Sequence, residues 1–251
     1  MKKYIFCLED ELKDFSPRQF RDFIFKTVVP DIMKHKPKNC KLTLSAVDQP
    51  AFTILPLNRS GFAMFSLAGI DNDVILKELK KFENQHRSVF GYIVHESPYL
   101  LGDRTWSCNE ESPGLILLTM FRKKPGLAKD QFMRIWFGEH SPKAIITHPL
   151  KNYIRNVVTG FITEDTPEFD GIVEEHFGTD EDLLNPVRMF GGIFKALPSM
   201  INVYFHVSKF LNLSNIRNYI CREYLLSGEI SACNEEMRDD IVVRDRGAVL
   251  V

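Results

Sequence analysis

The chain lacks the cysteine pairs that mark a disulfide-stabilised or zinc-binding protein. Its five cysteines are widely spaced among 251 residues and include no CxxC motif. An odd, scattered set argues against a disulfide framework and a zinc knuckle, and is typical of a reducing compartment. The apolar stretch at residues 4–8 is short and acidic residues follow it at once, so no signal peptide is predicted. We therefore expect a cytoplasmic protein.

Long runs of one charge and long apolar runs are also missing. Lys and Arg (32) nearly balance Asp and Glu (33), so nucleic acid is not expected as a partner. The most apolar region, residues 190–213, is interrupted by Lys195, Pro198, His206 and Lys209, which argues against a membrane span. The sequence has no phosphate-cradling glycine loop, nucleophile elbow or dinucleotide fingerprint. We accordingly predict no cofactor.

What the sequence does contain is an aromatic stripe that ends in an imidazole. Phe132, Trp136 and His140 recur at four-residue spacing, so on a helix they share one face. The helix is predicted to start after residues 125–126 and to falter at Ser141, which precedes a proline. His140 would then lie near a helix end, where free carbonyls favour a protonated ring and a pKa near neutrality. The alternative is that the stripe only packs the core.

The two halves of the sequence show the same order of predicted elements. Residues 4–94 read as strand, helix, strand, strand, helix and strand, which is the βαββαβ order of a ferredoxin-like unit. Shifted by 112 positions, the first strand, turn and helix match the second half without a gap, with Phe20 on Phe132. Near the end of each half the offset is 127, so the second half holds 15 extra residues (127 − 112).

The two halves differ at the positions of the aromatic stripe. At the offset of 112, Val28 matches His140 and Ile24 matches Trp136, so the first half lacks the polar part of the stripe. An imidazole in one copy alone favours a single working cavity.

The extra residues make an apolar connection at 191–206, rich in Phe, Met, Ile and Tyr. We predict a helical flap over one mouth of a cavity or over the seam between the halves, with glycines and Pro198 as its joints. A core helix extension, or contact with a partner or a membrane surface, is the alternative.

Polar residues in two strands of the second half should divide between two faces. Strand alternation places Glu174 with His176 on one face of residues 171–177 and Glu175 on the other. In the neighbouring strand Tyr153 and Arg155 share a face, and Asn156 points to the other. Adjacent acids in a central strand are costly to bury unless they are paired or protonated. A salt bridge from Arg155 to one acid is the simplest interpretation.

Several ordered motifs of the second half resemble the EthD family. They are the strand at 114–124 and its turn at 124–127, Trp136 with His140-Ser141-Pro142, His148-Pro149-Leu150, Tyr153-Ile154-Arg155-Asn156, and the strand at 169–174. The resemblance implies the dimeric α/β-barrel class, in which ferredoxin-like units pair their sheets around a cavity. It also links the chain to ether degradation, oxidoreductase chemistry and polyketide-type ring chemistry, between which fold does not decide.

We therefore predict an α+β chain of two tandem ferredoxin-like βαββαβ units that form an intramolecular dimeric-α/β-barrel arrangement, with a helical insertion in the second unit. The expected parts are a degenerate unit at residues 1–108, an EthD-like unit at 109–230 with the apolar insertion near 191–213, and a C-terminal arm at 231–251.

The predicted site is a general acid/base site. The candidate catalytic residues are His140, which moves a proton, and Glu174, which orients it. The candidate substrate-binding residues are Trp136, Tyr153, Asn156, His176 and Phe121. His140, His176 and Glu174 could also form a two-histidine, one-carboxylate metal set, but no tight ligand spacing supports it, so no metal is predicted. Related barrels bind haem, yet no residue stands out as an axial ligand.

The expected partner is a small, largely apolar molecule, aromatic or polyketide-like. The expected chemistry is proton transfer or cofactor-free oxidation, or a lyase or cyclase-like reaction, in a monomer or a homodimer. Two alternatives stay open: a non-catalytic carrier of such a molecule, and a protein-interaction module that uses the apolar insertion.

Overall fold

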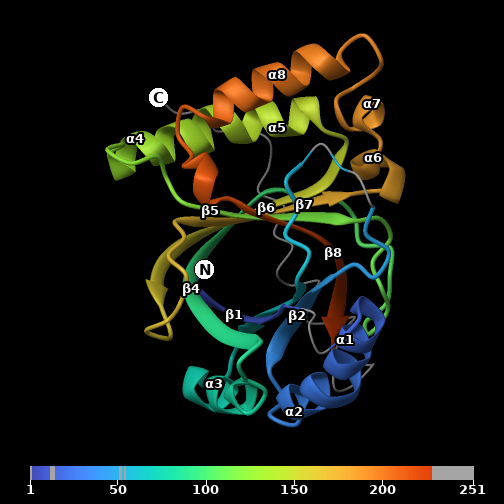
Figure 1. The fold of residues 1–251 in the computed structure, drawn as a ribbon, viewed down its shortest axis with the longest axis vertical. Helices are drawn as coiled ribbons and strands as arrows, with labels where there is room; N and C mark the ends of the chain where they lie inside the picture. Colours follow the sequence, from blue (N-terminus) through green and yellow to red (C-terminus); the bar gives the residue numbers. More distant parts are fainter. Residues whose placement is uncertain (1, 12–14, 51–52, 54, 228–251) are drawn as a thin grey trace.

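Eight described strands close into an antiparallel barrel that lies between two layers of helices (Figure 1). The computed structural model describes residues 2–11, 15–50, 53 and 55–227, and the structural statements below concern these residues. The expected arm at 231–251 lies outside them. The fold is α+β, as the sequence predicts.

The first half supplies four strands and the lower helical layer of Figure 1. Its elements are β1 (Lys2–Asp10), α1 (Pro17–Phe23), the π-helical turn η1 (Ile24–Val28), α2 (Val29–Met33), β2 (Lys38–Ser45), β3 (Gly61–Ala68), α3 (Asn72–Lys80) and β4 (Arg87–Leu100).

The second half supplies the other four strands and the upper layer. Its elements are β5 (Ile116–Phe121), α4 (Lys129–Arg134), the π-helical turn η2 (Ile135–His140), α5 (Ser141–Thr147), β6 (Leu150–Phe161), β7 (Gly171–Phe177), α6 (Asp180–Leu184), α7 (Pro186–Met189), α8 (Ala196–Val207), the 3₁₀ turn η3 (Leu213–Asn215) and β8 (Arg217–Leu226). The helix expected at 179–190 divides at Pro186, and the apolar insertion forms α8.

The strand order repeats around the barrel. The first half contributes β4-β1-β3-β2 and the second β8-β5-β7-β6, so each half places its strands in the order fourth, first, third, second. The antiparallel pairs β2–β8 and β4–β6 join the halves and close the barrel.

The first long helix of each half passes through a proline without breaking. Pro30 and Pro142 lie near the starts of α2 and α5, and the π turns before them end at Val28 and His140, positions that differ by 112. Proline lacks an N–H and clashes with the preceding turn, and a local π turn accommodates both effects. The expectation that the helix falters at Ser141 is therefore wrong, and His140 lies inside a continuous helix.

Apolar side chains form four clusters around the sheet. The first occupies the barrel interior and includes Ile5, Phe62 and Tyr219. A second lies between the first-half sheet and α1, η1, α2 and α3, and a third between the second-half sheet and α4, η2 and α5. The fourth joins β5 and β7 to α6, α7 and the start of α8. Both faces of each sheet are thus buried, which determines where polar residues can act.

The cysteines only partly follow the expectation. Cys7, Cys40 and Cys221 are buried thiols, whereas Cys108 is disulfide-bonded. The expectation was the absence of a disulfide framework, and the bond at Cys108 was not foreseen, because spacing does not show which distant cysteines a fold brings together. A cytoplasmic location stays a prediction without that support. None of the described helices combines the length and the hydropathy that a membrane span requires.

Candidate functional site

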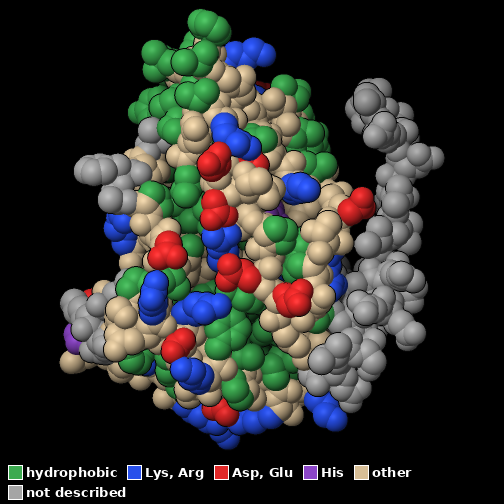
Figure 2. Space-filling view, turned by 90° about the vertical axis from the view of Figure 1, so that its right-hand side faces the viewer, with side chains coloured by type: hydrophobic (Ala, Val, Ile, Leu, Met, Phe, Trp, Pro, Cys, Tyr) green, Lys and Arg blue, Asp and Glu red, His purple; other side chains and the backbone are tan. Residues whose placement is uncertain are grey.

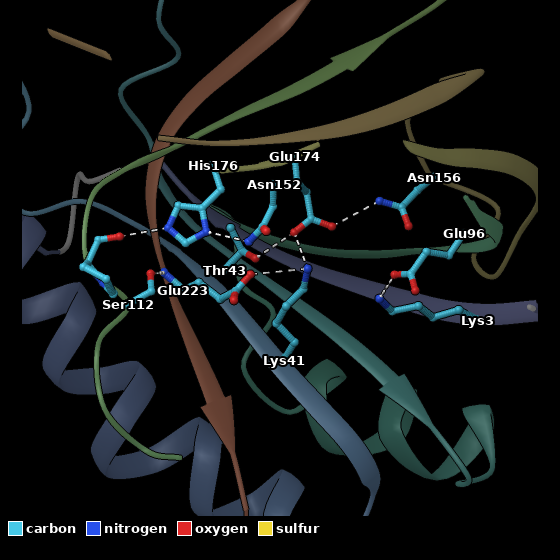
Figure 3. Close-up of polar contacts among 11 residues, drawn as sticks. Lys3, Lys41, Thr43, Glu96, Ser112, Asn152, Asn156, Glu174, His176 and Glu223 are labelled. Carbon is cyan, nitrogen blue, oxygen red and sulfur yellow. Dashed lines mark hydrogen bonds and ion pairs between the residues drawn. The ribbon is translucent and has the colours of Figure 1, made fainter. Parts of the chain in front are cut away.

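The sheet of the second half separates the predicted site residues. On β7, Glu174 and His176 point into the barrel (Figure 3), and Glu175, which alternates with them along the strand, points outward to the helices. On β6, Asn156 lies on the inner face and Tyr153 on the outer face. This alternation is as predicted. The expected pairing of His140 with Glu174 is nevertheless not made, because the sheet lies between them.

Inside the barrel Glu174 belongs to a polar network that joins the halves. Its Oε2 lies 2.5 Å from Lys41 Nζ on β2 and accepts from Thr43 Oγ1 at 3.4 Å, and its Oε1 accepts from Asn156 Nδ2 at 3.1 Å. Lys41 Nζ also lies 3.5 Å from Glu223 Oε2 on β8. All these side chains are almost fully buried.

The charges of this network stabilise one another. Burial alone would raise the pKa of Glu174, but Lys41, Lys3 and the hydrogen bond from Asn156 outweigh it and hold the pKa below its usual value. Burial also works against the charge of Lys41, yet the nearby carboxylates raise its pKa overall. Glu174 is therefore a permanently ionised partner of Lys41, and a salt bridge between an acid and Arg155 is not formed.

His176 is held at the mouth of the barrel by two hydrogen bonds. Its Nε2 lies 2.9 Å from the carbonyl oxygen of Pro113, so this nitrogen donates, and its Nδ1 accepts from Asn152 Nδ2 at 3.2 Å. The edge of the Trp106 ring packs on it. A hollow of about 20 Å³ beside the ring has room for one water molecule. The ring is therefore engaged by the protein itself.

On the outer face, aromatic side chains form a layer between the sheet and the helices. The Trp136 ring lies 5.0 Å from Phe121 on β5 and 5.5 Å from Phe132 on α4. Gly171 on β7 makes the room, since a Cβ there would stand 2.6 Å from the Trp136 ring. Tyr153 is fully buried in the same layer. The structure thus brings together three of the candidate substrate-binding residues, Trp136, Tyr153 and Phe121.

His140 lies at the helical side of this layer, stacked on a second histidine. The two rings of His140 and His206 are 5.5 Å apart and nearly parallel, and Phe210 packs against both. Burial, together with a smaller effect of the neighbouring His206, lowers the pKa of His140 to about 3. The expected titration near neutrality is therefore wrong, because His140 is half-buried within a continuous helix, with its ring packed against His206 and Phe210, and gains nothing from a helix end. His206, from the insertion, was not predicted.

Glu175 is the acid that shares this layer. It is Tyr153's partner in the β6–β7 register, and its charge raises the pKa of Tyr153. Burial raises the pKa of Glu175 itself to about 7. The sequence placed adjacent acids on opposite faces, but it did not reveal which of the two faces carries the helices, so Glu175 was not singled out.

Four buried polar atoms in this layer have no hydrogen-bond partner among the described residues. They are Trp136 Nε1, His140 Nδ1, Tyr153 Oη and His206 Nε2. The Ser141 hydroxyl and the Trp136 side chain both lie close to the Tyr153 hydroxyl, but neither contact has hydrogen-bond geometry, and Ser141 gives its own hydrogen bond to the Trp136 carbonyl oxygen at 2.8 Å. Buried polar groups are almost always paired, so a cluster of unpaired ones indicates a site for an absent polar atom.

Arg155 closes the edge of the layer. It donates to Ser141 Oγ at 3.1 Å and to the backbone and side chain of Ser97, and its guanidinium lies 3.8 Å from the Phe137 ring centre. Through Ser141 it fixes the helix that carries Trp136.

The alternative metal set is divided by the sheet, since His140 lies outside the barrel and His176 with Glu174 inside it. These three side chains do not converge on one ion. A larger, open hollow of about 700 Å³ lies at the other end of the barrel, where Arg217 pairs with Glu9 at 2.9 Å. Its polar lining does not suit an apolar ligand.

No protein-family model and no curated protein sequence matches the chain. Solved structures do. An anthrone oxidase-like protein aligns with a TM-score of 0.55 and 10% identity over 91% of this chain and 94% of that chain. A Lactobacillus acidophilus protein provisionally named a monooxygenase aligns with a TM-score of 0.48 and 8% identity over 90% and 98% of the two chains. A protein provisionally named a chlorite dismutase aligns with a TM-score of 0.42 and 14% identity over 92% of this chain and 99% of that chain.

At these identities the likeness concerns the fold alone. The barrel resembles the fold of the anthrone oxidase-like protein. The narrower EthD resemblance stays a prediction.

Proposed function

We propose that the protein binds a small, largely apolar molecule, aromatic or polyketide-like, between the second-half sheet and the helices α4, η2, α5 and α8, and transfers a proton to or from it. The observation that carries the proposal is the group of four unpaired buried polar atoms within an aromatic layer. Apolar walls with a few convergent polar groups are typical of a small-molecule site.

The side chains divide into an acid/base and hydrogen-bonding groups. Glu175, with a pKa of about 7, exchanges a proton near neutral pH and replaces Glu174 as the proposed catalytic carboxyl. Tyr153 stays protonated because burial raises its pKa, so its hydroxyl can donate to an oxygen of the ligand that gains charge. Trp136 Nε1, which can only donate, can give a second hydrogen bond to that oxygen. His140, whose low pKa keeps it neutral, hydrogen-bonds the ligand rather than moving its proton.

Entry of a ligand requires α8 to shift, because side chains fill the layer. Gly191 and Gly192, which precede α8, have φ angles of 81° and 120° that favour glycine. His206 and Phe210, at the end of the insertion, cover His140. This arrangement supports the predicted role of the insertion as a flap.

We also infer that the halves are two tandem ferredoxin-like units, at 1–108 and 109–230, and that the second is EthD-like. The repeated strand order and the π turns at matching positions support this inference. A proton-abstracting site in such a barrel would suit cofactor-free oxidoreductase chemistry. Fused-ring phenols and anthrones are therefore the first ligands to test.

Tryptophan fluorescence offers a direct binding assay. The chain has two tryptophans, and Trp106→Phe leaves Trp136 as the single reporter. We expect anthrone-type ligands to quench its emission with saturation. Tyr153→Phe removes one donor and should weaken binding by about tenfold, the effect of one hydrogen bond. Tyr92→Phe, in the barrel interior, removes a hydroxyl bonded to Pro167 and is the matched control. Equal binding by both variants, or no ligand-induced change in emission, would refute the site.

The non-catalytic carrier is the second candidate, because the same unpaired atoms would hold a ligand without turnover. Glu175→Gln separates the two. Catalysis predicts retained binding with loss of at least a hundredfold in proton exchange of a labelled ligand, followed by NMR. If Glu175→Gln leaves the rate of ligand proton exchange unchanged, the protein is a carrier rather than an enzyme.

A further inference from the structure

The outer face of α8 and the loop before it expose a continuous apolar surface. Phe194 is 93% exposed and Phe205 62%. The apolar surface consists of Ile193, Phe194, Leu197, Ile201, Tyr204 and Phe205. Figure 2 shows hydrophobic side chains gathered at the top of the molecule, where α8 lies, beside a basic side chain. Leu197, Ile201 and Phe205 recur every four residues, so one helical face points outward while the other holds His206 on His140.

The segment that carries this apolar surface has charged side chains of one sign only. The sequence has no Asp or Glu between Asp182 and Glu223, forty consecutive residues in a chain with 33 acids. Exposed Lys195 and Lys209 stand at the two ends of α8. Acidic residues on neighbouring elements include Asp182, whose carboxylate pairs with Arg188, and Glu139, which lies near His206.

We propose that the apolar surface of α8 docks on an anionic lipid surface, with the helix lying in the plane of the interface. A helix of 12 residues is about 18 Å long, too short to cross a bilayer but suited to lie on it. Aromatic and aliphatic side chains enter the boundary between headgroups and acyl chains, and Tyr204 places its hydroxyl at headgroup level. Lys195 and Lys209 meet anionic headgroups at both ends.

The charges favour lipid over a second copy of this chain. Two α8 helices packed antiparallel about a two-fold axis would bring the lysine at one end of each helix beside the lysine at the other end of its neighbour. The segment offers no acidic side chain to neutralise that pair, and like charges facing each other at an interface are unfavourable. An anionic bilayer offers negatively charged headgroups to both lysines at once.

Docking would also place the flap of the proposed site against a source of apolar molecules. This consequence rests on the proposed function, whereas docking itself does not. Vesicle binding is therefore measured without ligand, so that loss of docking and loss of ligand binding are separate results.

The test is flotation of the full chain with vesicles of phosphatidylcholine alone and of phosphatidylcholine mixed with phosphatidylglycerol. We expect binding to the mixed vesicles that weakens with salt. Phe194→Ser with Phe205→Ser should reduce the partition coefficient more than tenfold, and Lys195→Gln or Lys209→Gln about fivefold each. Phe161→Ser, at a half-exposed phenylalanine of β6, is the matched control and should bind as the unchanged protein does.

Three results would overturn the proposal. The first is no flotation with mixed vesicles, and the second is equal flotation of the apolar-surface variants and the control. The third is a dimer in sedimentation analysis that Phe194→Ser abolishes, in a protein that does not bind vesicles. The last would assign the surface to a second copy. Because the substituted residues are exposed, far-UV circular dichroism should show each variant folded.

Discussion

The two halves of the barrel share a backbone plan but differ in what lies between sheet and helices. In the first half that layer contains Phe20, Ile24 and Val28 among other apolar side chains. At the matching positions the second half has Phe132, Trp136 and His140, and β7 adds the buried carboxyl of Glu175. The corresponding helices, each with a π turn at the same place, therefore cover an apolar core in the first half and a layer with polar groups in the second half.

The difference shows where this chain can tolerate buried polar atoms. An unpaired buried polar group costs about 1–3 kcal/mol, and a domain has only about 5–15 kcal/mol of net stability. At the matching helix positions the first half has only apolar side chains, so the unpaired atoms of Trp136 and His140 have no counterparts there. This asymmetry is the expected result of one working site in a repeated fold.

The largest expected effect concerns the network that joins the halves. Lys41→Met leaves Glu174 and Glu223 buried without their cation, and breaking one partner of a buried ion pair costs about 3–5 kcal/mol. We expect urea unfolding at pH 7 to show this loss, with ligand binding to the folded fraction retained. The double variant Lys41→Met, Glu174→Gln should recover much of it. A stable Lys41→Met protein would contradict a structural role for Glu174.

The next effect is a pH dependence that belongs to the second half. The pKa of Glu175 is about 7 in the folded chain against an ordinary value of 4.5, so the folded state holds this proton more tightly. The free energy of unfolding should therefore fall as pH rises from about 4.5 through 7, by up to about 3 kcal/mol. Glu175→Gln should abolish this slope in urea titrations, and Glu164→Gln at the surface should not. An unchanged slope in Glu175→Gln would mean that another group titrates.

A smaller effect tests how the aromatic layer is built. Gly171→Ala places a Cβ within 2.6 Å of the Trp136 ring and 2.8 Å of Phe121, so the rings must move. Overpacking of this kind costs about 1–3 kcal/mol. Gly160→Ala, whose Cβ would meet Ile93 at an ordinary 3.4 Å, is the matched control. Thermal unfolding and Trp136 emission should change in the first variant alone; a change in both would locate the effect in the strands rather than the layer.

The sequence predicted the elements and their order well, because apolar periodicity and turns are local. The alternation of residues 171–177 also placed Glu174 and Glu175 on opposite faces. It could not decide which face holds a site, since both faces of this sheet are buried. The partner of Glu174 was beyond reach for a different reason: Lys41 is 133 positions away and meets it across the barrel.

Predictions from local sequence were wrong where the chain adopts a rare conformation or depends on tertiary contacts. The proline after Ser141 was expected to end the helix, but a π turn carries the helix through it. That single difference changes His140 from a residue at a helix end to one inside a continuous helix with a desolvated ring, and reverses the direction of its pKa shift. Composition did identify the insertion as apolar, though its stacking of His206 on His140 depends on the tertiary arrangement.

The smallest effect compares the starts of the two long helices. Ser16 caps α1 through a capping box with Gln19, whereas Ala128, 112 positions later, gives α4 no side-chain cap although Gln131 is kept at the third position. Ala128→Ser should therefore complete a capping box and stabilise the chain by about 0.5–1 kcal/mol, and Ser16→Ala should destabilise it by a similar amount. Chemical denaturation can resolve both. Opposite signs of similar size would show that the repeat extends to the energetics of helix initiation, whereas a neutral Ala128→Ser would show that α4 has replaced its cap by the packing of the aromatic layer.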